Sequence, residues 1–200
     1  MDTFANIGLI ILGAVLGIGS SGAFWWLQSH FWAPNIKFSE ELAEYELMGG
    51  ESFFQCAFKN IGKRDIIDLD VQVRIGIKGY MDATGWAYHT VSSNASRIPL
   101  LANDKMRRVR LFDTREKIQF IDALSKSIRS VIESCASLRE VLNLGSDAAV
   151  RVHVFGYDSF SGSRKHFPSP SYRVSDVRKG TFSGLDVVQN DGFRQMPESG

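Results

Sequence analysis

The chain has 200 residues, of which 44% are hydrophobic and 22% are charged, and its formal net charge is +1. These proportions are typical of a folded protein and exclude a disordered chain, and the near-zero charge gives no reason to expect a nucleic-acid partner. The two cysteines, Cys56 and Cys135, are too few for a disulfide scaffold and have no metal-binding spacing. Free buried thiols are expected, with a single disulfide between them as the alternative.

The first segment of the chain predicts one membrane-spanning helix. No charged residue occurs between Phe4 and Leu27, which satisfies the requirement of ~20 apolar residues for crossing a bilayer. A cleaved secretory signal is the alternative, because small residues at 20–23 could form its cleavage site. Such a signal begins with positive charge, whereas Asp2 is the only charged side chain before the run. We therefore predict a membrane anchor over residues 1–32.

The residues that flank this apolar run predict its orientation. Trp25, Trp26 and Trp32 are expected at the far membrane interface, where amphipathic aromatic rings gather. No lysine or arginine precedes the run, and the first one after it is Lys37. The tendency of positive charge to stay inside therefore favours a cytoplasmic placement of the remaining chain.

Small residues recur along one side of the predicted helix. Gly13, Gly17 and Ser21 are spaced by four residues, so they share a helix face. Such a stripe allows two helix backbones to approach closely, which predicts association between helices in the membrane. Glycine is also common in membrane helices in general, and that remains the alternative.

The segment 33–188 predicts a single β-rich domain. Phe54, Cys56 and Phe58 alternate with more polar neighbours, as in a half-buried strand. The next run has the clearest period of two, with apolar residues on one face and polar residues on the other. Its predicted core face consists of Ile67, Leu69, Val71, Val73, Ile75 and Ile77. Further strands are predicted at Trp86–Val91, Arg107–Phe112, Ala149–Phe155, Ser171–Val174 and Leu185–Val188.

One internal segment, 113–144, has apolar residues at intervals of three and four rather than two. This spacing predicts an amphipathic helix, or a pair of shorter ones, inserted into the β domain and packed on it. A helix that binds a partner is the alternative. The polar end of the chain, 189–200, is expected to be a flexible tail.

Three segments of the chain resemble the cytoplasmic immunoglobulin-like domain of inward-rectifier potassium channels. They are FFQCAFKNIGKRDIIDLDVQVRI at 53–75, WAYHTVSSNASRIPLL at 86–101 and VRVHVFGYDSFSGSRKHFPSPSYRVSDVRKGTF at 150–182. The resemblance implies a mainly β immunoglobulin-like antiparallel sandwich and a cytoplasmic placement. The chain has no second membrane helix, pore loop or filter sequence, so none of the channel's functional residues is carried over.

A basic cluster lies on one predicted strand and its preceding turn. Lys105, Arg107, Arg108 and Arg110 could contact anionic lipid, where each basic residue contributes about 1 kcal/mol. The alternative is a strand whose arginines are simply solvated.

The remaining motifs indicate no catalytic or metal site. The four histidines have no metal-binding spacing, and the turn 157–162 lacks a nucleophile elbow. No cofactor is expected.

The sequence thus favours a membrane-anchored, single-pass, non-enzymatic module for interaction or assembly, which binds the lipid bilayer and either a protein partner or further copies of itself. The alternatives are an accessory or regulatory subunit of a membrane transport or channel complex, and, less favoured, a hydrolase that uses the 157–162 turn.

Overall fold

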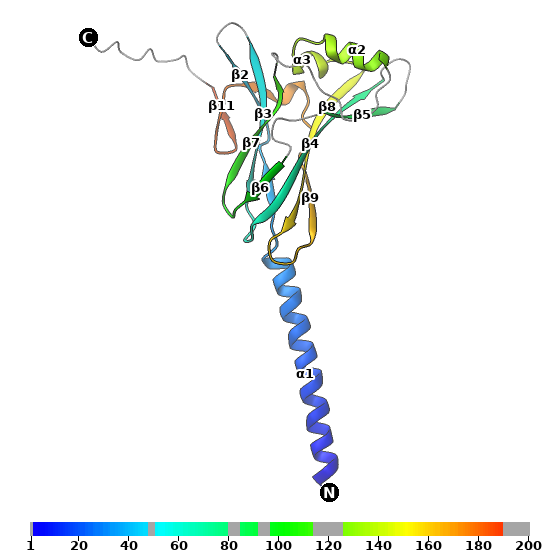
Figure 1. Cartoon of the computed structure of the whole chain (residues 1–200), viewed down its shortest axis with the longest axis vertical. Helices are drawn as coiled ribbons and strands as arrows, with labels where there is room; N and C mark the ends of the chain where they lie inside the picture. Colours follow the sequence, from blue (N-terminus) through cyan, green and yellow to red (C-terminus); the bar gives the residue numbers. More distant parts are fainter. Residues whose placement is uncertain (1, 48–50, 80–84, 92–96, 114–125, 190–200) are drawn as a thin grey trace, which may run out of the picture.

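The computed structural model describes residues 2–47, 51–79, 85–91, 97–113 and 126–189. Its first element is α1 (Asp2–Phe31), which stands away from the rest of the chain (Figure 1). The 23 residues Asn6–Gln28 of α1 are long and apolar enough to cross a membrane, and none of this span is buried against the protein. At 1.5 Å per residue the span measures roughly 34 Å, close to the ~30 Å thickness of a bilayer's hydrocarbon core.

After α1, the described residues of the chain fold into two five-stranded sheets and a small hairpin. The first sheet contains β1 (Ile36–Phe38), β3 (Ser52–Asn60), β2 (Leu42–Glu46) and β10 (Val177–Lys179) in this order, with β7 (Met106–Asp113) paired to β3. The second contains β5 (Trp86–Val91), β4 (Ile66–Lys78), β8 (Asp147–Asp158) and β9 (Arg164–Pro168), with β6 (Arg97–Leu101) paired to β4. The hairpin consists of β11 (Thr181–Ser183) and β12 (Asp186–Val188). Strands within each sheet pair antiparallel, except that β10 runs parallel to β2.

The two sheets enclose one apolar core, to which both contribute alternate residues. Phe54 and Phe58 from β3 and Val73 and Val152 from the second sheet are fully buried in it. Because side chains alternate between the faces of a strand, the polar residues between them point outward. The fold class predicted from the sequence is confirmed: the protein is mainly β and forms an antiparallel sandwich, preceded by one long apolar helix.

The predicted core face of β4 is wrong at one end of the strand. Asp68 has a φ of 49°, and the pairing register with β8 shifts between Ile67 and Asp70. A bulge of this kind inserts an extra residue, so the alternation reverses on its far side. Ile66 and Leu69 are therefore buried, whereas Ile67 is exposed.

The predicted strand at Ser171–Val174 is also wrong. Only Tyr172 forms a bridge, to Val150, and the chain then continues into the 3₁₀ helix η1 (Val174–Asp176). Six strands that the sequence pattern did not predict are β1, β2, β6, β9, β10 and β11, each of five residues or fewer. So few residues show too little alternation for a period of two to be recognised.

The inserted helical segment is present as two short helices. They are α2 (Lys126–Ser134) and α3 (Leu138–Val141), at the end of the sandwich far from α1 (Figure 1). Ile132, Leu138 and Val141 are buried in the main core, so the apolar side of this segment packs on the sandwich. Strand β7 extends to Asp113; the predicted part at 114–125 lies outside the described residues, as does the predicted tail beyond Gln189.

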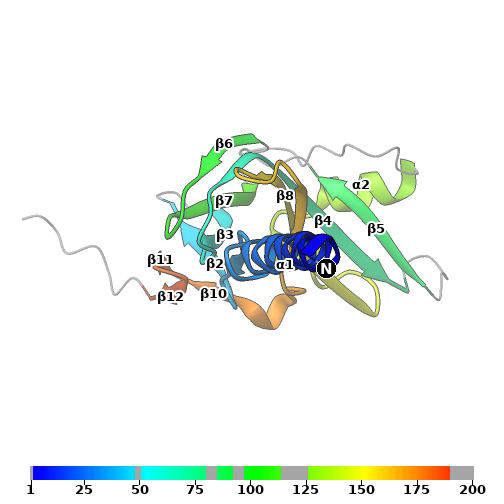
Figure 2. The ribbon, with the colours of Figure 1, turned by 90° about the horizontal axis from the view of Figure 1, so that it is seen from below.

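The junction between α1 and the sandwich is closely packed. Pro34 is buried, and the Asn35 carbonyl accepts hydrogen bonds from the amides of Ile61 (2.8 Å) and Gly62 (3.2 Å). The Arg64 side chain donates through Nη2 to the backbone carbonyl of Gln28 in α1 (2.9 Å). Seen from below, α1 projects in front of the middle of the sandwich rather than beside it (Figure 2).

Candidate functional site

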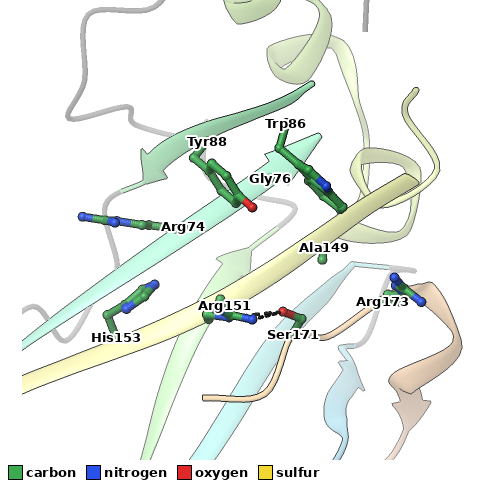
Figure 3. A pocket seen from close by; sticks show the side chains of 9 residues that line it. All are labelled: Arg74, Gly76, Trp86, Tyr88, Ala149, Arg151, His153, Ser171 and Arg173. Carbon is green, nitrogen blue, oxygen red and sulfur yellow. Dashed lines mark hydrogen bonds between the residues drawn. The ribbon is translucent and has the colours of Figure 1, made fainter. Parts of the chain in front are cut away.

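The outer face of the second sheet carries a hollow of about 400 Å³, formed mainly by β4, β5 and β8 (Figure 3). We call it the arginine groove. Its lining residues are Arg74, Gly76, Trp86, Tyr88, Ala149, Arg151, His153, Ser171 and Arg173. None of these lining residues is an aspartate or a glutamate.

The central feature of the arginine groove is a pair of arginines on neighbouring strands. In the antiparallel register of β4 and β8, Arg74 lies directly opposite Arg151. Like charges that face each other across two strands destabilise a sheet. Arg151 donates from Nε to the Ser171 hydroxyl (3.1 Å), and Arg173 pairs with Asp147 (3.0 Å). Among the residues that the structure describes, no carboxylate forms an ion pair with Arg74 or Arg151, so the groove keeps an excess of positive charge.

Two aromatic rings form the wall of the groove that faces β5. Trp86 and Tyr88 are two residues apart on this strand, both are exposed, and their rings stack with centroids 5.9 Å apart. They lie over Gly76 of β4, where a Cβ atom would come within 2.8 Å of a Tyr88 ring carbon. Aromatic side chains commonly cover a glycine in this way, which explains the inner contacts of the rings. Their outer faces remain available to a ligand.

A histidine pair continues the groove toward β9. The rings of His153 and His166 stack, and Nδ1 of His153 lies 2.8 Å from Nε2 of His166. Partial burial, followed by the charges of Arg74, His166 and Arg151, lowers the pKa of His153 to about 4. His153 is therefore neutral at pH 7, and the positive charge of the groove comes from its arginines.

The side chains of the groove offer groups that suit the binding of an anion. A guanidinium group offers two parallel N–H donors that match a carboxylate or a phosphate, and the neighbouring rings offer a flat apolar surface. Over the described part of the chain, no group of three His, Cys, Asp or Glu side chains is placed to hold a metal ion. Ser171 and Tyr88 are the two lining residues that carry a hydroxyl group. The Ser171 hydroxyl accepts from Arg151, and no general base is among the hydrogen-bond partners that the structure describes for it.

The small residues of the predicted association stripe lie on α1. Gly13, Gly17 and Ser21 are all exposed, and a Cβ atom at either glycine would meet nothing within 4 Å. The fold of one chain therefore does not require glycine at these positions. Association through the stripe stays a prediction.

The tryptophans predicted at the membrane interface lie where α1 ends. Trp25 and Trp26 are exposed in its last two turns, and Trp32 is exposed immediately after it. This position next to the sandwich is compatible with an interface, and the membrane contact itself stays a prediction.

The basic cluster is spread along β7. Lys105 belongs to the turn between β6 and β7, and this turn lies at the end of the sandwich near α1 (Figure 1). Arg107 is exposed. Arg108 donates to the Phe182 carbonyl (2.7 Å), whereas Arg110 pairs with Asp113 (2.9 Å). At ~3.3 Å per strand residue, Arg110 lies roughly 16 Å beyond Lys105. The predicted lipid contact is untested for all four residues, and Lys105 is the one placed nearest α1.

Two other sequence predictions have a structural outcome. Cys56 and Cys135 are free thiols, and burial raises the pKa of Cys56 to about 11. Tyr157 and Asp158 of the predicted 157–162 turn are the last residues of β8, and residues 159–163 form the turn to β9. The Asp158 carboxylate accepts from the Phe160 amide (3.0 Å) and the Ser161 hydroxyl (2.8 Å) of this turn. These contacts are the local side-chain to backbone hydrogen bonds of a strand-connecting turn.

The arginine groove was not predicted from the sequence. In the sequence, Arg74 and Arg151 fall between the apolar residues of their strands, and Trp86 and Tyr88 alternate on β5. These were the available signals. These side chains come together only because of the register in which the strands pair. The alternation of residues along one strand does not predict that register.

No protein-family model and no curated protein sequence matches the chain. A solved structure that is similar to part of it is Spo0M, a sporulation control protein from Bacillus subtilis, with 16% sequence identity and a TM-score of 0.34. The match covers 72% of this chain and 49% of Spo0M, so the chain spans about half the length of that protein. The resemblance to the potassium-channel domain is not tested by these comparisons and stays an expectation.

Proposed function

We propose that this protein is a membrane-anchored, non-enzymatic interaction module that binds an acidic segment of a protein partner in the arginine groove. The observation that carries the proposal is the direct opposition of Arg74 and Arg151 on β4 and β8. A carboxylate placed between the two guanidinium groups would remove their repulsion and form charge-assisted hydrogen bonds with both. The sheet would thus be stabilised by the ligand that it recognises.

A protein segment suits the groove better than a lipid headgroup. The aromatic wall lies on β5, toward the end of the sandwich that carries α2 rather than toward α1 (Figure 1). If α1 spans the membrane, the aromatic wall of the groove lies toward the end of the sandwich that is far from the bilayer surface. Trp86 and Tyr88 can then pack against the hydrocarbon part of an extended acidic peptide, while the arginines bind its carboxylates.

The groove can be tested with full-length protein in lipid nanodiscs and a fluorescein-labelled hexaglutamate peptide as the probe. We expect the double variant Arg74→Gln/Arg151→Gln to weaken binding at least tenfold in fluorescence anisotropy, because hydrogen bonds to charged groups each contribute about 1.5–3 kcal/mol. The matched control is Arg178→Gln, which removes an exposed arginine that pairs with Glu41 outside the groove. Equal affinity of the double variant and the control would refute the groove as the binding site.

Assembly through α1 is the second part of the proposal and has a separate test. Gly17→Leu is expected to weaken association between copies in lipid vesicles, because a bulky side chain keeps two helix backbones apart. The control is Gly19→Leu, since residue 19 lies about 200° around the helix from residue 17 at nearly the same depth. Energy transfer between labelled copies should fall for Gly17→Leu alone. An unchanged signal would remove the stripe as an association surface.

A further inference from the structure

Three turns meet at the end of the sandwich from which α1 emerges, and we call them together the α1 end. They are residues 61–65 between β3 and β4, 102–105 between β6 and β7, and 159–163 between β8 and β9 (Figure 1). The Asp65 carbonyl accepts from the Ser159 amide (3.2 Å), and the Asp65 carboxylate accepts from the Asn103 amide (2.8 Å). Hydrogen bonds to Asp65 thus connect the three turns into a single surface.

This surface is held at a fixed position relative to α1 by the guanidinium group of Arg64. Its Nη2 donates to the Gln28 carbonyl (2.9 Å), its Nη1 donates to the Asp158 carboxylate (3.0 Å), and its carbon lies 4.3 Å from the centroid of the Phe160 ring. Gln28 is the last residue of the apolar span. Phe160 therefore lies within one side-chain length of the level at which the span ends.

The α1 end exposes apolar side chains at the tips of its turns. Phe160 is 63% exposed and Ile61 is 52% exposed, at positions where turns usually carry small polar residues. The exposed lysines Lys63 and Lys105 lie in the same set of turns. Asp104 is also exposed there, but it is paired with Lys59. Apolar side chains flanked by exposed lysines are the combination that binds the surface of a bilayer.

We infer that the α1 end is a second membrane-contact surface, which inserts Ile61 and Phe160 into the interface of the bilayer that α1 crosses. Lys63 and Lys105 then lie at the level of the lipid phosphates, and the sandwich is held upright on the membrane instead of swinging freely. The arginine groove consequently faces sideways at a constant height above the bilayer. The inference rests on the proposed role of α1 as a membrane anchor.

The depth of the α1 end can be measured with a spin label at Ser159→Cys, next to Phe160. The protein is full length, carries Cys135→Ser, and is placed in nanodiscs of phosphatidylcholine and phosphatidylserine; Cys56 is fully buried and should not be labelled. We expect the label to be more accessible to oxygen and less accessible to a water-soluble nickel complex than a reference label at Asn143, an exposed residue after α3. A label at Ser159 that matches the Asn143 reference would overturn the inference.

Substitutions of the two inserted side chains complete the test. Ile61→Ser and Phe160→Ser should each shift the Ser159 label toward the values of the Asn143 reference. Ile61→Ser is the cleaner variant, because Phe160 also contacts Arg64. Val188→Ser, which replaces an exposed apolar residue on the β11–β12 hairpin, should leave the depth unchanged. Equal effects of Val188→Ser and Ile61→Ser would contradict a specific contact.

One further label separates the failure of this inference from a failure of the anchor. A label at Val15→Cys, in the middle of the span of α1, should be inaccessible to the nickel complex if α1 crosses the bilayer. A protected Val15 label together with a water-exposed Ser159 label would refute only the membrane contact of the α1 end. An exposed Val15 label would refute the anchor itself, and with it the basis of the contact.

Discussion

Asp158→Asn is expected to lower the free energy of unfolding by about 3 kcal/mol, because removal of one partner of a buried ion pair leaves the other charge uncompensated. The Asp158 side chain is only 3% exposed and that of Arg64 11%. The carboxylate also accepts from the Phe160 amide and the Ser161 hydroxyl. In thermal unfolding of the full chain in nanodiscs, followed by near-UV circular dichroism, this loss corresponds to a decrease in Tm of roughly 9 °C.

Asp104→Asn is the matched control for this substitution. Asp104 also forms an ion pair, with Lys59, but its side chain is 79% exposed. Exposed pairs contribute little to stability because water and salt screen them. Similar Tm values for Asp158→Asn and Asp104→Asn would show that the Arg64–Asp158 pair does not stabilise the fold.

The effect of Asp158 should depend on pH in one direction. Burial raises the pKa of this carboxyl, but hydrogen bonds from Phe160, Ser161 and Arg64, together with the Arg64 charge, outweigh it, so the pKa lies below its usual value. A lowered pKa in the folded state gives a stabilisation that is complete above the unfolded pKa of about 3.9 and is lost as the pH falls through the folded pKa. The difference in Tm between the wild type and Asp158→Asn should therefore be constant at neutral pH and decrease below about pH 4.

Gly62→Ala is expected to disrupt the junction between α1 and the sandwich. A Cβ atom at Gly62 would lie 2.3 Å from the Asn35 nitrogen and 2.6 Å from both the Ala33 oxygen and the Pro34 Cα. All three are backbone atoms, so no side-chain rotation can relieve the overlap and the linker must move. We expect a loss of about 2 kcal/mol in the free energy of unfolding, as for other overpacked sites.

The displaced linker should also have a local signature. The Ile61 amide donates to the Asn35 carbonyl (2.8 Å), and this bond should open in Gly62→Ala. Hydrogen exchange of the Ile61 amide should then accelerate. The ratio between the exchange rates of the β4 amides and the β8 amides should not change. Gly85→Ala is the control, because a Cβ atom at Gly85 meets nothing within 4 Å. Unchanged exchange at Ile61 would mean that the linker accommodates the methyl group and that the junction is not closely packed.

The two substitutions affect different parts of the same connection. Asp158 holds the Arg64 guanidinium group, which in turn binds the α1 backbone, whereas Gly62 allows the linker to lie against the turn after β3. If the α1 end contacts the membrane, both variants should also broaden the range of depths of the Ser159 spin label. A rigid junction is what would give an anchored interaction module a constant orientation toward its partners.

Local pattern was sufficient to predict the long elements of the fold. The uncharged run Phe4–Leu27 predicted α1, and alternation predicted β3, β4, β5, β7 and β8 within a few residues. These predictions succeeded because each element has enough residues to show its own period. The same method predicted the wrong face for Ile67. A bulge at Asp68 reverses the alternation there, and the residue types around it do not reveal the bulge.

The sequence by itself therefore determined that one long apolar helix precedes a mainly β domain, because hydrophobic spacing along a segment is a property of that segment alone. The tertiary structure decided which solvent-facing residues meet. Arg74 lies opposite Arg151 only in the register of β4 and β8, and Arg64 binds Gln28 and Asp158, which are 36 and 94 positions away in the chain. Both sites depend on contacts between segments that are far apart in the chain, which no local pattern specifies.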